Sequence, residues 1–349
     1  MKKSSNEMAE RLRVLTLFGT RPEAIKLAPV IRCLQGADWV ESTIVVTGQH
    51  RELLEQVLRV FDVTPDADLD LMRPGQPLTD LAGRALVAVG EILRRYQPDL
   101  LLVQGDTVSV LVGALAAFYE RVAIGHVEAG LRSFNRNDPF PEEINRRLVS
   151  VVAELHFAPT ARARANLLAE GVPSDRIEVT GNTVVDALLS VRNGPVPAEF
   201  GAPTSIDIDI RRRTILVTLH RRESWGAPMS AICSSLRVAL DRFPDTDLLI
   251  PMHPNPIVRQ VVTFALGDHP RAHLVEPLDY VSMIRAMARC HLIVTDSGGI
   301  QEEAPALGKP VLVVRETTER PEAIEAGTAR LVGTNGRAVL AALTDLLGN

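Results

Sequence analysis

The chain has 349 residues, of which 46% are hydrophobic and 23% are charged, and its formal net charge is −5. A chain of this length favours two domains over one. Its mild acidity gives no electrostatic reason to expect nucleic acid or an anionic membrane as a partner. Three widely spaced cysteines argue against a disulfide framework and fit a reducing, cytoplasmic location. We expect no signal peptide, and no stretch approaches the roughly 18 apolar residues of a membrane span.

Short apolar runs alternate with amphipathic segments in the first half of the chain. This alternation predicts βαβ units and a parallel sheet, and strands that are almost continuously apolar indicate a sheet covered on both faces. The predicted strands are Arg13–Phe18, Ser42–Thr47, Leu100–Val103, Val122–His126, Leu155–Ala158 and Ile177–Thr180. The predicted helices include Glu23–Leu34, Glu52–Phe61, Leu78–Tyr96 and Val108–Tyr119.

A segment rich in proline and glycine interrupts this pattern at 192–213 and predicts a linker. We therefore expect an N-terminal Rossmann-like domain over 1–191 and a C-terminal one over 214–349, with a ligand site in the cleft between them. The last helix is a candidate to pack back on the N-terminal domain. The predicted strands of the second domain are Thr214–Thr218, Asp247–Ile250, Ala272–Val275, Leu292–Thr295 and Val311–Val314.

Three acidic motifs stand close together in the first half: Q-G-D-T, H-V-E-A-G-L-R and P-F-P-E-E-I-N-R. The first two directly follow predicted strands. Carboxylates at the carboxyl ends of neighbouring parallel strands share the crevice where open α/β sheets bind ligands. Asp106, Glu128 and Glu142 are therefore candidates for acid–base chemistry.

The turn after the first strand reads F-G-T-R-P-E-A-I-K, and Pro22 suits the first turn of a helix. Arg21 would lie at that helix N-terminus, where backbone N–H groups attract anions, and Lys26 about one turn further in. We expect these two cations to bind a phosphate or a sugar, against the alternative of a capped helix with two solvated cations. Neither a G-x-G-x-x-G fingerprint nor a Walker A loop is present.

A second candidate anion site is T-D-S-G-G-I-Q-E-E-A, which follows a predicted strand. Ser297, Gly298 and Gly299 would present successive N–H groups to a diphosphate at a helix start. Glu303 would lie about one turn in, on the ligand side, where it could bind ribose hydroxyls, while Glu302 points elsewhere. The alternative is a tight turn whose acidic first turn complements the helix dipole.

His220 opens H-R-R-E at the end of another predicted strand, and it titrates near neutrality, so it could assist a leaving diphosphate. Arg320 precedes a proline and a glutamate, as Arg21 does, which again places an arginine at a helix start. A solvated loop is the alternative there. The spacing of histidines and cysteines predicts no metal site.

Taken in order, these strings resemble one family. They are G-T-R-P-E-A-I-K-L-A-P, T-G-Q-H-R-E-L-L, Q-G-D-T, H-V-E-A-G-L-R-S, P-F-P-E-E-I-N-R, G-N-T-V-V-D-A-L, H-R-R-E-S, D-S-G-G-I-Q-E-E-A and R-E-T-T-E-R-P-E. The chain resembles the non-hydrolysing UDP-N-acetylglucosamine 2-epimerases of bacteria from about residue 13 to about residue 333.

The resemblance implies a glycosyltransferase-B-like fold, with a UDP-sugar bound between two Rossmann-like domains. Because the catalytic candidates come from both halves of the chain, we expect the two halves to close over UDP. The resemblance also implies a homodimer and no cofactor. The implied reaction interconverts UDP-GlcNAc and UDP-ManNAc: UDP leaves C1 as a proton leaves C2, 2-acetamidoglucal forms, and UDP adds back. One face of the sugar then needs a base and the other an acid.

Motif matching carries the family's residues onto this chain. The implied catalytic residues are Asp106, Glu128, Glu142 and His220. The implied contacts to UDP and sugar are Arg21, Lys26, Ser297, Gly298, Gly299, Glu303 and Arg320. Three residues match a second, allosteric UDP-GlcNAc site of some members: Gln49, Arg221 and His253.

Some positions depart from the family pattern. Leu219 precedes H-R-R-E where glycine or alanine is common, and Leu278 and Met283 replace the glutamine and phenylalanine of many uridine sites. Gly75 stands where a further arginine of the allosteric site is expected. Four alternatives follow: a hydrolysing 2-epimerase, a 2-epimerase of a related UDP-sugar, a UDP-sugar glycosyltransferase and a UDP-sugar-binding module without catalysis.

Overall fold

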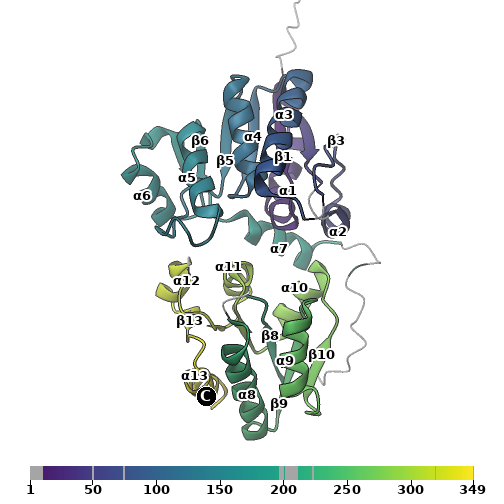
Figure 1. Cartoon of the computed structure of the whole chain (residues 1–349), viewed down its shortest axis with the longest axis vertical. Coiled ribbons are helices and arrows are strands. Elements are labelled where there is room, and N and C mark those ends of the chain that lie inside the picture. Colours follow the sequence, from purple (N-terminus) through teal and green to yellow (C-terminus); the bar gives the residue numbers. More distant parts are fainter. Residues whose placement is uncertain are drawn as a thin grey trace, which may run out of the picture. The chain divides into compact units, whose positions relative to one another are not determined.

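The computed structural model describes residues 11–48, 51–73, 75–195, 200, 211–221, 224–318 and 320–348, with the side chains of 51–53 excepted. The chain divides into two compact units, Met1–Ala187 and Leu188–Asn349, called unit 1 and unit 2 below (Figure 1). Helix α7 (Thr183–Asn193) contains this boundary. Most of the linker predicted at 192–213, namely 196–199 and 201–210, lies outside the described residues.

Unit 1 contains a seven-stranded parallel sheet in the order β3-β2-β1-β4-β5-β6-β7. Its strands are β1 (Leu12–Phe18), β2 (Val40–Val46), β3 (Ala67–Asp68), β4 (Leu100–Gln104), β5 (Ala123–Val127), β6 (Leu155–Ala158) and β7 (Ile177–Val179). Its helices are α1 (Arg21–Gln35), α2 (Arg51–Phe61), α3 (Leu78–Tyr96), α4 (Val108–Tyr119), α5 (Glu142–Val152), α6 (Ala161–Ala169) and the short 3-10 helix η1 (Ser174–Arg176).

Alternate residues of the central strand β1 face opposite sides of the sheet of unit 1. Leu15 and Leu17 are buried with apolar residues of α3 and α4, whereas Val14 packs toward Val30 of α1. Burial on both faces explains why the strand reads as an almost unbroken apolar run. The helices α3, α4 and α5 lie side by side over one of these faces (Figure 1).

Unit 2 contains a six-stranded parallel sheet in the order β10-β9-β8-β11-β12-β13. Its strands are β8 (Arg213–Thr218), β9 (Thr246–Pro251), β10 (Ala272–Val275), β11 (Leu292–Thr295), β12 (Val311–Val313) and β13 (Ala329–Leu331). Its helices are α8 (Ala227–Arg242), α9 (Pro256–Leu266), α10 (Tyr280–Arg289), α11 (Gly298–Ala306), α12 (Pro321–Glu325) and α13 (Gly336–Gly348).

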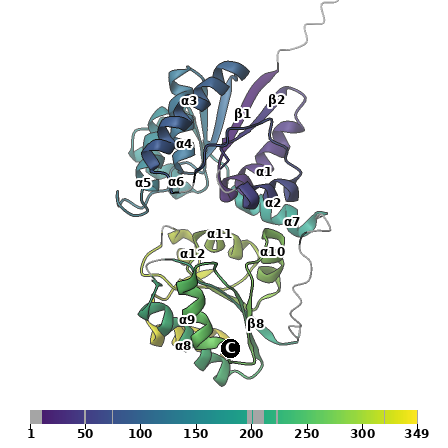
Figure 2. The same cartoon turned by 45° about the vertical axis from the view of Figure 1, so that its right-hand side comes forward.

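The core of unit 2 joins its central strands to α8, α9 and α13. The last helix, α13, packs against α8, and its residues Val339, Leu343 and Leu347 belong to this core. The neighbouring helices α8 and α9 are visible side by side in Figure 2. The C-terminal helix is thus part of the core of its own unit.

Both sheets reverse their strand order at one place. In unit 1 the chain moves from β1 outward to β2 and then returns to β4 on the other side of β1. In unit 2 the same reversal separates β8 from β11. Such switch points leave a crevice at the carboxyl ends of the strands, where α/β sheets bind ligands. Each unit therefore has one preferred place for a site.

The predicted fold class, two α/β units with parallel sheets, is confirmed. Several elements agree at both ends with the sequence prediction, among them α3, α4, β6, β10 and β11. The sequence prediction missed β3 and β13, which have only two and three residues. Strands this short carry too few residues to show a pattern of alternation.

Candidate active site

Asp106 follows β4 at the switch point of unit 1, as predicted. Its Oδ2 accepts a hydrogen bond of 2.9 Å from Nε of Arg146 on α5, and the two side chains form an ion pair. Asn145, also on α5, donates from Nδ2 to the Asp106 carbonyl at 2.9 Å. These contacts hold the start of α5 against the turn after β4 and fix the orientation of the Asp106 side chain.

A buried histidine also contacts the turn after β4. His126 on β5 is 0% exposed, and its Nε2 lies 2.7 Å from the carbonyl oxygen of Gly105. Burial lowers the pKa of His126 to about 3. The ring is therefore neutral, and it must donate from Nε2 because a carbonyl oxygen can only accept. From the sequence, His126 was predicted only as a strand residue. Its position between the motifs of Asp106 and Glu128 was the available signal.

Glu128 follows β5, one strand further along the same edge of the sheet. Its Oε2 forms an ion pair with Nζ of Lys26 on α1, and both side chains are nearly buried. The backbone of Glu128 is left-handed, with φ of 66°. This conformation is costly for a residue with a side chain, and such strain is common at functional sites. Two residues predicted for different roles are thus direct partners.

Glu142 and Glu143 open α5 but differ in environment. Glu143 is 1% exposed, and its carboxylate accepts the backbone N–H groups of Ser133 at 2.9 Å and Phe134 at 3.2 Å. Glu142 is half-buried, and its side chain has no hydrogen-bond partner within the described part of the chain. Glu143 holds the loop before α5, whereas Glu142 is available to a ligand. This difference supports the choice of Glu142 over Glu143.

The N-terminus of α1 contains its own anion. The carboxylate of Glu23 accepts the backbone N–H groups of Gly19 at 2.6 Å and Thr20 at 2.8 Å, and the hydroxyl of Thr107 at 2.6 Å. Burial raises the pKa of Glu23 even though these hydrogen bonds act in the opposite direction. Arg21 is half-buried at the first position of the helix. Glu23 therefore already binds the two N–H groups of the turn that precedes α1, where a substrate phosphate was expected.

The N-terminus of α11 in unit 2 has no such internal carboxylate in its first turn. A Cβ atom on Gly299 would meet only the Ser297 hydroxyl, at 4.0 Å, so the space above this residue is open. A Cβ atom on Gly298 would lie 2.7 Å from Nη1 of Arg320, so this guanidinium rests directly on the glycine. Ser297, Gly298, Gly299 and Arg320 thus lie together at the start of α11, although the backbone N–H of Ser297, expected to face a diphosphate, donates to Oγ1 of Thr295 at 2.9 Å.

The two glutamates of α11, Glu302 and Glu303, are both largely buried. Glu302 accepts a hydrogen bond of 2.6 Å from Nε of Arg320 and thereby fixes the guanidinium over Gly298. Glu303 is 8% exposed in the same helix. From the sequence, Glu302 was expected to point away from the ligand, and its contact with Arg320 was not predicted. The two residues are 18 positions apart, and no local spacing connects them.

His220 lies at the switch point of unit 2, after β8. Its Nδ1 is 2.7 Å from Oδ1 of Asp296, which follows the neighbouring strand β11. The ring of His220 stacks on that of His253, with 6.0 Å between centroids. Arg221 is the next residue and donates its backbone N–H to Asp296 Oδ2 at 2.9 Å. Arg221 and His253, two of the three allosteric candidates, therefore lie beside His220, while the third, Gln49, lies outside the described residues.

Asp296 is the functional candidate that the sequence analysis missed. It directly precedes Ser297 in the glycine-rich motif, and its strand pairs with the strand that ends at His220. The pairing of β8 with β11 at the sheet's switch point was the available signal.

Among the described residues no group of three acidic, histidine or cysteine side chains could hold a metal ion. Likewise, none of the described helices has the length and apolarity to cross a membrane.

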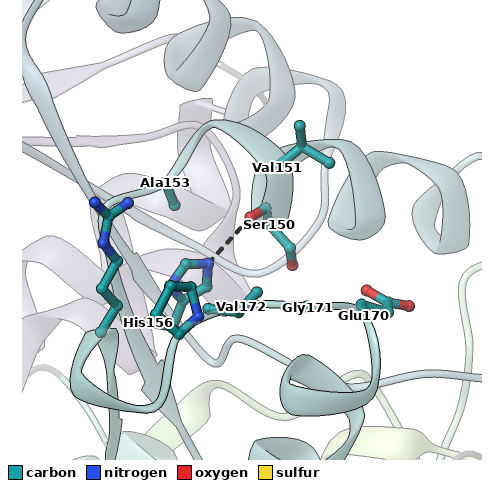
Figure 3. A pocket seen from close by; sticks show the side chains of 9 residues that line it. Ser150, Val151, Ala153, His156, Glu170, Gly171 and Val172 are labelled. Atoms are coloured by element: carbon teal, nitrogen blue, oxygen red, sulfur yellow. Dashed lines mark hydrogen bonds between the residues drawn. The ribbon is translucent and has the colours of Figure 1, made fainter.

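A separate pocket of about 250 Å³ lies in unit 1 at the amino ends of β6 and β7 (Figure 3). It is lined by Ser150, Val151, Ala153, His156, Glu170, Gly171, Val172, Pro173 and Arg176. The predicted carboxylates lie at the opposite, carboxyl ends of the strands. This pocket contains none of the predicted site residues and is not the candidate active site.

Comparison with known proteins identifies close relatives. The family model described as UDP-N-acetylglucosamine 2-epimerase matches residues 32–349. A protein of Yersinia pestis named UDP-N-acetylglucosamine 2-epimerase is 50% identical over 340 residues, which cover 96% of this chain and 90% of that protein. The crystal structure of UDP-GlcNAc 2-epimerase from Neisseria meningitidis bound to UDP-GlcNAc matches with a TM-score of 0.88 and 44% identity, covering 97% of this chain and 92% of that one.

A more distant structural relative is the glycotransferase of kitacinnamycin. Its TM-score is 0.65 at 13% identity, and the match covers 97% of this chain and 92% of that chain. At this identity the likeness concerns the fold alone. Together with the Neisseria structure it confirms the predicted glycosyltransferase-B-like fold.

Proposed function

Because the chain belongs to the UDP-N-acetylglucosamine 2-epimerase family, we propose that it interconverts UDP-GlcNAc and UDP-ManNAc without hydrolysing either. The observation that carries this proposal is the gathering of acidic residues at one sheet edge of unit 1. Asp106 is paired with Arg146, Glu128 is paired with Lys26, and Glu142 is unpaired within the described part of the chain.

The chemistry requires such groups because C2 of the sugar has no neighbouring carbonyl to make its proton acidic. The C1–O bond breaks and its electron pair leaves with UDP, while the C2 proton moves to one carboxylate and 2-acetamidoglucal forms. A second acid protonates C2 from the opposite face as UDP adds back to C1. We assign these two roles within Asp106, Glu128 and Glu142. Each well-placed acid or base contributes about 10²–10⁴-fold to the rate.

We assign the diphosphate to unit 2 because the two helix termini differ. Glu23 already accepts the N–H groups of the turn before α1, whereas α11 presents Gly298, Gly299 and the hydroxyl of Ser297 beside the guanidinium of Arg320. Backbone N–H groups and a cation at this position stabilise the negative charge that develops as UDP leaves. His220 then assists the same leaving group.

The remaining contacts extend from these two centres. We assign Glu303 to the ribose hydroxyls, and we assign Arg21 and Lys26 to the sugar side of the substrate. The half-buried Leu278 and Met283 would border the uracil. An activating second UDP-GlcNAc bound at Arg221 and His253 would contact residues that adjoin His220, so it could act on the catalytic histidine through them.

We also propose a homodimer formed through the helical face of unit 1. The neighbouring helices α3, α4 and α5 expose several large apolar side chains, namely Val87, Phe118, Tyr119, Leu148 and Val151. Apolar residues gathered on one face commonly mark an interface. Sedimentation equilibrium should give twice the chain mass for the wild type, and a Val151→Glu variant should shift the equilibrium toward monomer.

We also propose a cytoplasmic location, because the free thiols of Cys33, Cys233 and Cys290 fit a cytoplasmic enzyme.

The reaction is tested by incubating the protein with UDP-GlcNAc in D₂O and following the products by NMR. We expect deuterium at C2 in both UDP-GlcNAc and UDP-ManNAc. Absence of both exchange and product would refute the epimerase assignment. A coupled assay for free UDP distinguishes the hydrolysing alternative, because that enzyme would release UDP and ManNAc in equal amounts.

A further inference from the structure

Asp296 has the environment of a residue with a precise task. Its side chain is 0% exposed, although it stands next to the open turn at Ser297. Oδ2 accepts the backbone N–H groups of His220 and Arg221, each at 2.9 Å. Oδ1 lies 2.7 Å from Nδ1 of His220. Both oxygens therefore contact the His220–Arg221 segment, one through its backbone and one through its imidazole.

We propose that Asp296 is a positioning residue that fixes the tautomer and orientation of His220 for the departure of UDP, an inference that rests on the proposed function. A hydrogen bond across the 2.7 Å contact between Nδ1 of His220 and Oδ1 of Asp296 requires N–H at Nδ1, because a carboxylate oxygen can only accept. Nε2 is then the atom that faces a ligand. When the ring is protonated, Nε2–H donates a hydrogen bond to the diphosphate oxygen that receives the electrons of the C1–O bond.

The charges around His220 suit this role. Among the described residues, Asp296 approaches it from the end of β11, His253 from the segment after β9, and Arg221 is adjacent in the chain. Burial lowers the pKa of His253, and the charge of His220 lowers it further. His253 therefore stacks as a neutral ring and does not compete for the proton.

The carboxylate itself is held in its ionised form. Burial raises the pKa of Asp296, but the hydrogen bonds and the charge of His220, together with the two backbone N–H groups, bring the pKa below its ordinary value. An ionised, buried carboxylate with fixed oxygens orients its partner histidine and stabilises the imidazolium, as the aspartate does in serine protease triads.

The geometry makes Asp296→Asn a sharp test. The amide oxygen can still accept the two backbone N–H groups, so the turn after β8 should keep its shape. The amide NH₂ would then face His220 Nδ1 and donate to it. This forces the opposite tautomer, with the proton on Nε2 of a neutral ring, and removes the charge that favours imidazolium.

The matched control is Asp247→Asn. Asp247 is also a buried aspartate of unit 2, 5% exposed, and lies 3.9 Å from a histidine, His273. It stands near the beginning of β9, away from the carboxyl ends of the strands, and its main partner is Arg212 at 2.9 Å. This variant should lose stability while its kcat and its pH profile stay unchanged.

The experiment combines ¹⁵N NMR of the histidine rings with kinetics on the full chain. The signals of His220 are assigned by their loss in His220→Gln. We expect wild-type His220 to have its proton on Nδ1 when neutral, and Asp296→Asn to have it on Nε2. We expect kcat to fall about 10²–10⁴-fold with little change in KM.

Two results would overturn the inference: an unchanged His220 tautomer in Asp296→Asn, or a kcat that matches that of the wild type. Isothermal titration with UDP and thermal unfolding show whether the variant is folded. The NMR result does not depend on turnover. If the wild-type protein is inactive toward UDP-GlcNAc, the proposed function fails while the tautomer assignment is still tested.

Discussion

Nε of Arg146 lies 2.9 Å from Oδ2 of Asp106, and Nη1 of the same guanidinium lies 3.3 Å from Oε2 of Glu143. One nearly buried cation, 7% exposed, therefore connects the carboxylate after β4 to the carboxylate that holds the loop before α5. The position of Glu142, next to Glu143, depends on the same contact. Arg146 thus couples the stability of unit 1 to the placement of two proposed catalytic residues.

Arg146→Met should lower both stability and activity. It leaves Asp106 and Glu143 without their shared cation, and removal of one partner of a largely buried ion pair costs about 3–5 kcal/mol of unfolding free energy. Urea unfolding measures this loss, and kcat should fall with it. Arg330→Ala is the control, because the Arg330–Asp345 pair is 53% and 52% exposed. It should cost less than about 1 kcal/mol. Equal losses in the two variants would contradict the role given to Arg146.

Glu142→Gln should lower activity, whereas Glu143→Gln should lower stability. Glu142→Gln should reduce kcat about 10²–10⁴-fold, because it removes a candidate acid or base. Its unfolding free energy should stay within about 0.5 kcal/mol of the wild type, since the side chain has no described partner to lose. Glu143→Gln should cost about 1–3 kcal/mol, because a buried carboxylate with three hydrogen bonds is lost.

Steady-state kinetics and thermal unfolding of the two variants separate these effects. If Glu143→Gln lost activity while remaining as stable as the wild type, and Glu142→Gln were unaffected, the assignment of the two residues would have to be exchanged.

Much of the fold could be predicted because both sheets are buried on both faces. Apolar runs such as that of β11 are therefore nearly continuous, and glycine or proline marks their ends. Site residues at strand ends, such as Asp106 and His220, were predictable for the same reason: the end of a buried strand is visible in the sequence.

The partners of those residues were not predictable, because they come from distant parts of the chain. Arg146 is 40 residues from Asp106, and Asp296 is 76 residues from His220. Only the order of strands in the sheet brings such residues together. Glu23 shows a further limit of prediction from sequence. An acidic residue in the first turn of a helix can complement the helix dipole or bind the N–H groups where a ligand anion is expected. Only the structure shows that Glu23 binds the N–H groups of Gly19 and Thr20.

His126 should make the folded protein less stable as the pH falls. Its pKa is lowered to about 3 in the fold, whereas an unfolded histidine takes up a proton near pH 6.5. Between these values the unfolded state binds one proton more, so the unfolding free energy decreases with falling pH by at most about 1.4 kcal/mol per pH unit. This contribution is fully present above about pH 6.5 and is lost below it.

Urea unfolding at about pH 7, 6 and 5 measures this dependence. His126→Gln keeps a donor for the Gly105 carbonyl but cannot titrate, so its unfolding free energy should fall less steeply. Part of the slope should remain, because burial also lowers the pKa values of His156 and His291. If the unfolding free energies of the wild type and the variant changed equally with pH, His126 would take up its proton equally in the folded and unfolded states, and the prediction would be wrong.

Gly298→Ala should weaken UDP binding through Arg320. A Cβ atom at this position would lie 2.7 Å from Nη1 and 3.0 Å from Cζ of the guanidinium, which would have to leave its place over the helix start. The loss of one oriented cation from a diphosphate corresponds to about 1–3 kcal/mol, or roughly 5–150-fold in Kd. Isothermal titration with UDP measures this change, and thermal unfolding should show a much smaller effect.

Gly83→Ala is the control for this glycine. Gly83 lies inside α3, and a Cβ atom there would meet nothing within 4 Å. Alanine should therefore raise the unfolding free energy by up to about 1 kcal/mol, since glycine is a poor helix former, and should leave UDP affinity unchanged. Glu302→Gln tests the same contact from its other side, because it weakens the 2.6 Å bond that fixes Arg320. If Gly298→Ala bound UDP as tightly as the wild type, Arg320 would not contact the diphosphate from its position over Gly298, and the assignment of UDP to this turn would lose its cation.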